Sequence, residues 1–356
     1  MLAIWKKLDW LLICAWFFIL GLSLITLNSI NFIYFQRQLV WIILSILVMF
    51  FGVLIDWKFL IFKKWFYYGL YLLSNFLLLI SFLQPKIIRG TKSWLSFYGF
   101  QFEPAELAKI SIIFLLAALF SKKYIIAWDT KNIIKFFIYT LIPTGLIALQ
   151  PDLGSAIIVM SVWLSFLFLS GINWKKLLFF IVIFLFAFFI LWNFYMAQYQ
   201  KNRIIGFLFP NYDPLGINYN VIQSKIAIGS GGLFGKGFGN GTQVNLKFLP
   251  EPQTDFIFAA YTEQWGLIGD LILLGLLFLI IYRINIIGKL AQNNYEKFIV
   301  LGTIIILMAN FFLNVGSNLG LLPITGVTFP FFSYGGSSLL TLTLLLVIVE
   351  YIKIGL

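Results

Sequence analysis

The chain has 356 residues, of which 61% are hydrophobic, 19% aromatic and only 11% charged. A soluble domain carries about 25% charged residues, so this composition indicates a polytopic membrane protein. The chain has no histidine, which excludes Ser-His-Asp catalysis and His-ligated zinc or haem. The net charge of +12 comes from basic residues scattered between apolar segments, so it does not indicate binding of nucleic acid.

Long apolar segments recur along the whole chain. A helix needs roughly 20 apolar residues to cross a bilayer. We therefore predict an all-α polytopic membrane protein, a single integral membrane domain over 1–356 with about ten transmembrane helices. A large extracytoplasmic loop, roughly 195–255, separates helices 7 and 8. The predicted spans are 10–28, 39–55, 65–83, 105–121, 133–150, 154–171, 176–194, 256–283, 297–315 and 337–353.

The basic residues predict the orientation of these helices. Most lysines and arginines fall in the short loops on the same side as the N-terminus, and such loops are cytoplasmic by the positive-inside rule. Both termini should therefore be cytoplasmic. The loops on the other side are longer and hold glycines, prolines and carboxylates. We expect the function to face outward.

Charged residues mark the outer ends of the fourth and sixth predicted helices. Pro104 suits a first helical turn, which makes Glu106 and Lys109 i,i+3 neighbours able to form an ion pair. The pair either lines an outward cavity or only neutralises itself. Asp152, in the turn after Pro151, either contacts a ligand or caps the next helix.

The long outer loop carries cations beside many glycines. Arg203, Lys225 and Lys236 lie in it, the last two within the glycine-rich run 223–239. Glycines let backbone N–H groups approach an anion and lysine adds a point charge, so a pyrophosphate is a suitable guest. The spacing is not that of a P-loop. The alternative is a flexible or re-entrant loop whose glycines serve close packing.

A carboxylate stands at the entrance to the eighth predicted helix. Pro250 and Pro252 keep the preceding backbone out of a helix, and Thr254 or Asp255 is then expected to cap the apolar helix that begins near Phe256. Asp255 falls near a water–lipid boundary, where an ionised group is costly unless it is used. It is therefore either a plain N-cap or a functional acid.

The segment 314–338, before the last predicted helix, is rich in helix breakers and hydroxyl groups. Irregular backbone at membrane depth is tolerated where it is buried in protein or lines a cavity. Ser333 is accordingly a candidate contact for a polar ligand.

Four of these motifs together resemble the SEDS family (shape, elongation, division, sporulation). They occur in the family's order across nearly the whole chain, and the run 239–250 is more similar to the RodA branch than to the FtsW division branch. The motifs are Gln150-Pro-Asp-Leu-Gly154, Gln223-Ser-Lys with Gly229-Ser-Gly-Gly232, Pro250-Glu with Thr254-Asp-Phe-Ile-Phe258, and Pro330-Phe-Phe-Ser-Tyr-Gly-Gly-Ser-Ser338.

The resemblance implies a peptidoglycan glycosyltransferase of the bacterial inner (cytoplasmic) membrane that polymerises lipid II during cell elongation. It implies that Asp255 is catalytic and that Glu106 and Lys109 form the family's charge pair. It also implies a class B penicillin-binding protein, within the elongation machinery, as partner. The chain departs from the pattern at 251–253, where a basic residue is common, and at Gln264, where a second acid is common.

An inverting transfer needs one base near the acceptor hydroxyl and cations on the leaving pyrophosphate. Asp255 suits the base, and Arg203, Lys225 and Lys236 suit the pyrophosphate. A Mg²⁺ or Mn²⁺ ion bridging Asp255 and the pyrophosphate is compatible with this scheme, although the residues define no metal site of their own. Two alternatives stay open: a flippase for lipid II, and a scaffold for cell-wall synthesis without chemistry of its own.

Overall fold

The computed structural model describes residues 2–84, 93–97, 100–122 and 130–356. Within these residues, nine helices are long and apolar enough to cross a membrane, and α8 (Leu153–Leu169) is a shorter apolar helix. The predicted all-α polytopic fold is confirmed. The nine are α2 (Trp10–Ile30), α3 (Phe32–Gly52), α5 (Lys64–Leu83), α6 (Pro104–Lys122), α7 (Thr130–Leu149), α9 (Trp174–Ile190), α13 (Ile257–Leu290), α14 (Asn294–Leu319) and α15 (Gly336–Ile354).

The remaining elements are short. The outer loop between α9 and α13 contains four of these short helices, joined by irregular chain. The short elements are α1 (Leu2–Lys7), α4 (Trp57–Ile61), the π-helix η1 (Leu191–Tyr195), α10 (Gln198–Leu208), α11 (Tyr219–Gly231), α12 (Thr242–Asn245), and an antiparallel pair of strands, β1 (Leu95–Phe97) and β2 (Phe100–Phe102), with Leu95 opposite Phe102.

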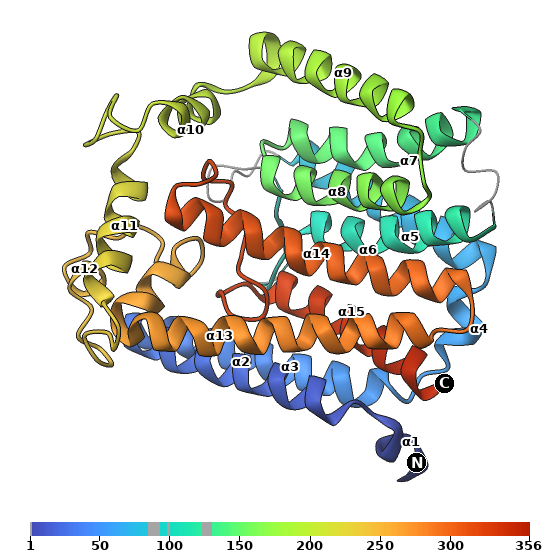
Figure 1. Ribbon diagram of the computed structural model, residues 1–356, viewed down its shortest axis with the longest axis horizontal. Helices are drawn as coiled ribbons and strands as arrows, with labels where there is room; N and C mark the ends of the chain where they lie inside the picture. Colours follow the sequence, from blue (N-terminus) through green and yellow to red (C-terminus); the bar gives the residue numbers. More distant parts are fainter. Residues whose placement is uncertain (1, 85–92, 98–99, 123–129) are drawn as a thin grey trace. The chain divides into compact units, whose positions relative to one another are not determined.

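The chain divides into two compact units. The first unit comprises Met1–Trp57, Ile205–Ala291 and Leu307–Leu356. In it, α2 packs against α3 and α13, α15 packs against α3, and α11 packs against α13 (Figure 1). The second unit comprises Lys58–Ile204 and Gln292–Ile306. In it, α6 is the buried central helix and contacts α5, α7 and α8.

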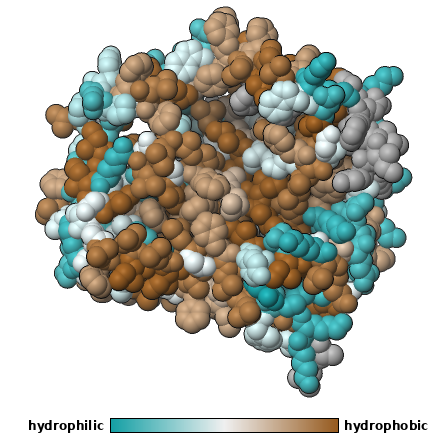
Figure 2. Space-filling view, viewed as in Figure 1, coloured by the Kyte–Doolittle hydropathy of each residue, from teal (hydrophilic) through white to brown (hydrophobic). Residues whose placement is uncertain are grey.

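Apolar side chains cover much of the surface as well as the core. Phe18 and Leu72 are each 66% exposed, and hydrophobic residues dominate the visible face (Figure 2). Because hydrocarbon takes the place of water around these helices, such exposure is favourable. Small hydroxyl side chains join the helices inside: Ser74 of α5 lies 2.8 Å from Ser111 of α6, oxygen to oxygen.

Candidate active site

Asp255 lies in a turn directly before the long helix α13. Residues 252–256 form this turn, and the N-cap of α13 is Phe256, whose side chain makes no capping bond. The expectation that Thr254 or Asp255 is the N-cap residue is therefore wrong. The Thr254 hydroxyl instead donates to Glu251 Oε2 at 3.2 Å. The Asp255 residue is half-buried, so part of it remains accessible.

Three consecutive backbone carbonyls hold this turn in place. The carbonyl of Gln253 accepts from the N–H of Tyr334 at 2.9 Å, and that of Thr254 accepts from Ser333 Oγ at 2.8 Å. The Asp255 carbonyl accepts from two side-chain amides of α14, Asn314 Nδ2 at 3.1 Å and Asn318 Nδ2 at 2.8 Å. The backbone that bears the acid is thus fixed by bonds from other segments.

Asn318 also ties this turn to the outer helices. Its Oδ1 accepts from the N–H of Ala259 at 3.2 Å, in the first turn of α13. Its backbone carbonyl accepts from Ser224 Oγ of α11 at 2.9 Å. Asn318 itself is fully buried. One residue therefore connects α11, α14 and the turn that carries Asp255.

Ser333, predicted as a contact for a polar ligand, is buried and bonded to this turn. It is 4% exposed, donates to the carbonyl of Thr254, and accepts from the N–H of Phe329 at 2.8 Å. Both bonds are internal to the first unit. Its role in the structure is to support the backbone next to Asp255.

Lys225 is the exposed cation of α11 and follows the buried Ser224. Its ammonium lies beside the end of α14, because a Cβ added to Gly320 would be 2.7 Å from Lys225 Nζ. Among the described residues it forms no ion pair or hydrogen bond through this ammonium. The negative end of a helix dipole favours a cation there, and the ammonium stays available to an anion.

Lys236 is engaged by a buried acid. Its Nζ lies 2.7 Å from Glu263 Oε1 and donates to Thr242 Oγ1 at 2.8 Å. Glu263 is fully buried and also accepts from the N–H of Gln243 at 3.0 Å. A buried carboxylate without its cation would be costly, so Lys236 is needed to stabilise this part of the fold.

The glycine-rich run packs against a break in α13. Gly266 has φ +63°, which interrupts the helix. The N–H groups of Leu267 and Ile268 bond instead to the carbonyls of Gly232 and Leu233. A Cβ on Gly235 would lie 2.1 Å from the carbonyl oxygen of Gln264. The packing alternative for these glycines therefore holds at this position, since the two backbones touch.

In the second unit, the predicted pair of α6 is present. Lys109 Nζ lies 2.8 Å from Glu106 Oε1, and both residues are buried. Glu106 Oε2 is also buried and has no hydrogen-bond partner among the described residues. The pair is thus incompletely satisfied among the described residues, and one carboxylate oxygen of Glu106 can accept a further hydrogen bond.

Asp152 belongs to the same charged group. Its Oδ1 accepts from the N–H of Ser155 at 3.1 Å and so caps α8, which confirms the capping alternative. Glu103, which is not among the predicted site residues, lies near both acids. Burial raises the pKa of Glu103 well above its usual 4.5, and the carboxylates of Asp152 and Glu106 raise it further. In the sequence, Glu103 stands directly before Pro104 and three residues before Glu106, and this spacing could have indicated that it belongs to the same charged group.

Arg203 is exposed on α10, where its guanidinium lies 5.6 Å from the centroid of the Tyr199 ring. It belongs to the second unit, as do Glu106, Lys109 and Asp152. The first unit holds the other predicted site residues, Lys225, Lys236, Asp255 and Ser333.

Comparisons with known proteins cover almost the whole chain. The model of a cell cycle protein family, FtsW/RodA/SpoVE, matches residues 2–355. The peptidoglycan glycosyltransferase MrdB of Escherichia coli K12 is 43% identical over 274 residues, which is 77% of this chain and 74% of MrdB. The probable peptidoglycan glycosyltransferase FtsW of Coxiella burnetii is 34% identical over 351 residues, 94% of this chain and 93% of that protein.

Solved structures resemble this fold over nearly the whole chain. A chain from a peptidoglycan synthase complex, which coordinates polymerization and crosslinking, has a TM-score of 0.81 at 28% identity and covers 97% of each chain. The rod shape determining protein RodA of Thermus thermophilus has a TM-score of 0.71 at 28% identity, covering 97% of this chain and 96% of RodA.

Proposed function

This chain belongs to the FtsW/RodA/SpoVE family of cell cycle proteins, the SEDS family, and is a multi-pass membrane peptidoglycan glycosyltransferase; we propose that Asp255 is its catalytic base. One observation supports this assignment above the others. Asp255 is half-exposed at the end of a membrane helix, while three hydrogen-bonded carbonyls fix the backbone that bears it. A base must be held within reach of the proton that it accepts, and a fixed backbone beside an accessible carboxylate supports that role.

The substrate proposed is lipid II, a disaccharide-peptide linked through pyrophosphate to a lipid. The Asp255 carboxylate accepts the proton of the acceptor's 4-hydroxyl. The hydroxyl oxygen attacks C1 of the donor sugar, and the bond from C1 to the pyrophosphate oxygen breaks. The lipid pyrophosphate leaves with the bonding electrons, and the configuration at C1 inverts. One carboxylate is sufficient, because no covalent sugar–enzyme intermediate forms.

The negative charge that develops on the pyrophosphate needs a cation. Lys225 fits this role best within the first unit, since its ammonium is exposed and unpaired among the described residues. Lys236 fits it less well because Glu263 already neutralises it.

A divalent ion, Mg²⁺ or Mn²⁺, is compatible with this chemistry, since it would offset charge on the pyrophosphate when bound. Within the described ranges, no three His, Cys, Asp or Glu side chains are grouped so as to hold a metal ion. The side chains there do not form a ready-made cage, and the roles of Asp255 and Lys225 are derived from these residues themselves.

We further propose that both termini are cytoplasmic, as the distribution of basic residues indicates. A structural relative belongs to a complex that coordinates polymerization and crosslinking. That relationship supports a crosslinking partner for this chain, for which a class B penicillin-binding protein of the elongation machinery has the right chemistry.

Polymerisation by the purified full-length protein tests the assignment of Asp255. We expect Asp255→Asn to abolish glycan synthesis from lipid II supplied on the outer side of liposomes, while the protein still inserts and keeps its thermal midpoint. Asp213→Asn, the same change elsewhere in the outer loop, should remain active. Full polymerisation by Asp255→Asn would remove Asp255 from the role of base. Lipid II movement without polymer from the wild type would point instead to a flippase, and full activity of the partner alone to a scaffold.

A further inference from the structure

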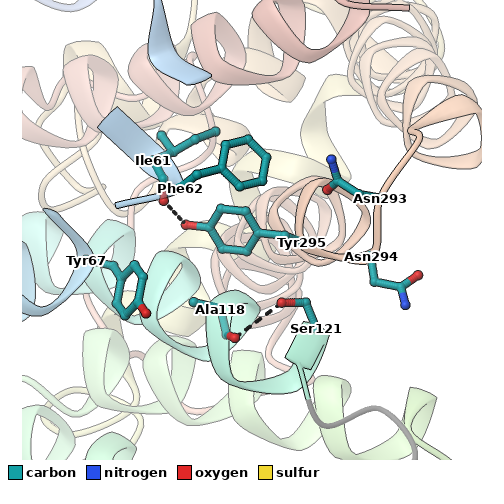
Figure 3. A pocket seen from close by; sticks show the side chains of 8 residues that line it. All are labelled: Ile61, Phe62, Tyr67, Ala118, Ser121, Asn293, Asn294 and Tyr295. Carbon is teal, nitrogen blue, oxygen red and sulfur yellow. Dashed lines mark hydrogen bonds between the residues drawn. The ribbon is translucent and has the colours of Figure 1, made fainter. Parts of the chain in front are cut away.

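A cavity of about 320 Å³ lies within the second unit, and neither Glu106 nor Asp152 lines it. Figure 3 shows the rings of Phe62, Tyr67 and Tyr295 on one part of its wall and the amides of Asn293 and Asn294 on another. This volume is at the lower end of the range for small-ligand sites. The lining is completed by Ile61, Ala118 and Ser121.

All the helices that line this cavity contribute residues from the same membrane end. Tyr67 lies in the first turn of α5, and Asn294 and Tyr295 open α14. Ser121 lies in the last turn of α6, which runs in the opposite direction. The cavity is therefore at the level of the lipid headgroups. By the positive-inside rule this is the cytoplasmic end.

Hydrogen-bond donors remain available on the cavity wall. The Asn293 side chain accepts from the N–H of Glu296 at 3.0 Å, which leaves its NH₂ group without a partner among the described residues. The amide of Asn294 likewise has no partner there. The Tyr295 hydroxyl, in contrast, already donates its proton to the carbonyl of Ile61 at 2.8 Å (Figure 3). The wall thus offers amide donors beside fixed aromatic rings.

Positive charge flanks the same cavity. Lys64 precedes Tyr67 by three residues on α5, and Lys297 follows Asn294 by three residues on α14, so each shares a helix face with a lining residue. Both lysines are exposed. The carboxylate of this region is Glu296, which is buried in the first turn of α14. The exposed charge next to the opening is therefore positive.

We propose that this cavity binds the phosphate-bearing headgroup of an anionic phospholipid of the cytoplasmic leaflet. Basic pockets between transmembrane helices on that side recognise such headgroups. The volume suits the headgroup alone, and the acyl chains lie along exposed apolar residues next to it, Phe62 at 43% and Trp65 at 63% exposure. The asparagine amides donate to the phosphate, and Lys64 and Lys297 supply charge.

Native mass spectrometry of the full-length protein with added cardiolipin or phosphatidylethanolamine tests this site. We expect cardiolipin to be retained preferentially. Each of Lys64→Gln and Lys297→Gln should weaken its retention about five-fold. Lys175→Gln, which removes an exposed lysine at the start of α9, is the matched control and should have no effect. Ser121→Leu, which fills the cavity without changing charge, should abolish the preference.

The thermal midpoint of each variant shows whether it is folded. Equal retention of both lipids by the wild type would overturn the proposal, and so would an equal loss in the Lys175→Gln control. Unchanged retention in Ser121→Leu would overturn the placement in this cavity. Displacement of cardiolipin by millimolar inorganic phosphate would show an anion site rather than a lipid site, which also contradicts the proposal.

Discussion

The side-chain amide of Asn318 donates a 2.8 Å hydrogen bond to the backbone carbonyl of Asp255, 63 residues away in the chain. The same asparagine accepts from Ala259 and, through its own carbonyl, from Ser224. The position of the proposed base is thus set in part by α14. The backbone of Asp255 is held by these bonds while its half-exposed side chain can meet a substrate proton.

We expect Asn318→Leu to lower kcat for polymerisation by about 100-fold, because a misplacement of roughly 1 Å is sufficient for such a loss. KM for lipid II should change little, since Asn318 is buried. Ser317→Ala is the matched control, because in the described part of the chain the Ser317 hydroxyl bonds only to the carbonyl of Asn314 in the same helix. Steady-state kinetics of the three proteins measures the effect. Wild-type kcat in a folded Asn318→Leu protein would show that Asp255 does not depend on this bond.

The buried pair of α6 yields a second prediction. Glu106→Ala leaves the Lys109 ammonium buried without its carboxylate, and Lys109→Ala leaves the Glu106 carboxylate buried without its ammonium. Each substitution should therefore impair polymerisation at least about ten-fold. Exchanging the two charges should recover part of the activity. Polymer yield from purified variants is the readout. Ser111→Ala, also buried on α6, is the control. Full activity in both single variants would reduce the pair to mere neutralisation.

Lys236 and Lys225 should respond differently to the same substitution. Lys236→Gln removes the partner of the buried Glu263, so we expect its thermal midpoint to fall by several degrees. Adding Glu263→Gln should restore part of that loss. Lys225→Gln should keep the midpoint and raise KM for lipid II. Thermal unfolding, monitored by size exclusion, compares the midpoints of Lys236→Gln and Lys225→Gln. A stable Lys236→Gln protein would contradict the structural role.

We expect the free energy of unfolding to depend on pH through Glu103. It lies just before α6, and burial, followed by Asp152 and Glu106, raises its pKa well above 4.5, although Lys109 lowers it. The folded state therefore keeps a proton that the unfolded state releases, and the free energy of unfolding falls as the pH rises above 4.5. Glu103→Gln mimics the protonated acid, so we expect a higher thermal midpoint than wild type at neutral pH.

The same experiment across the pH range provides its own check. The wild-type midpoint should decline between pH 4.5 and neutral, while that of Glu103→Gln should decline less. Asp152→Asn removes one of the charges that raise the pKa of Glu103, and it should shorten the range of pH over which the decline occurs. Parallel slopes for wild type and Glu103→Gln would show that Glu103 is ionised in the folded protein.

Much of the fold follows from local sequence alone. Hydropathy predicts the ten apolar helices found among the described residues, because each span is a continuous run that needs no partner to be recognised, although α3 begins at Phe32 rather than near 39. The i,i+3 spacing of Glu106 and Lys109 predicts their ion pair, and the turn after Pro151 predicts the cap formed by Asp152. These features depend on residues a few positions apart, so they can be predicted from the local sequence.

Other features arise only when distant segments meet. The amides that hold Asp255 come from α14, the partner of Lys236 is Glu263 of α13, and the glycines near 235 pack on a helix broken at Gly266. The N-cap of α13 is Phe256 rather than the expected Thr254 or Asp255, and the carbonyls of the turn before it are bound from α14 and the loop before α15. Hydropathy and spacing can be read from neighbouring residues, whereas the partner in a long-range buried hydrogen bond is known only once the chain has folded. The sequence alone determined that this is a helical membrane protein with an acid at one helix entrance; tertiary packing decided which residues hold that acid.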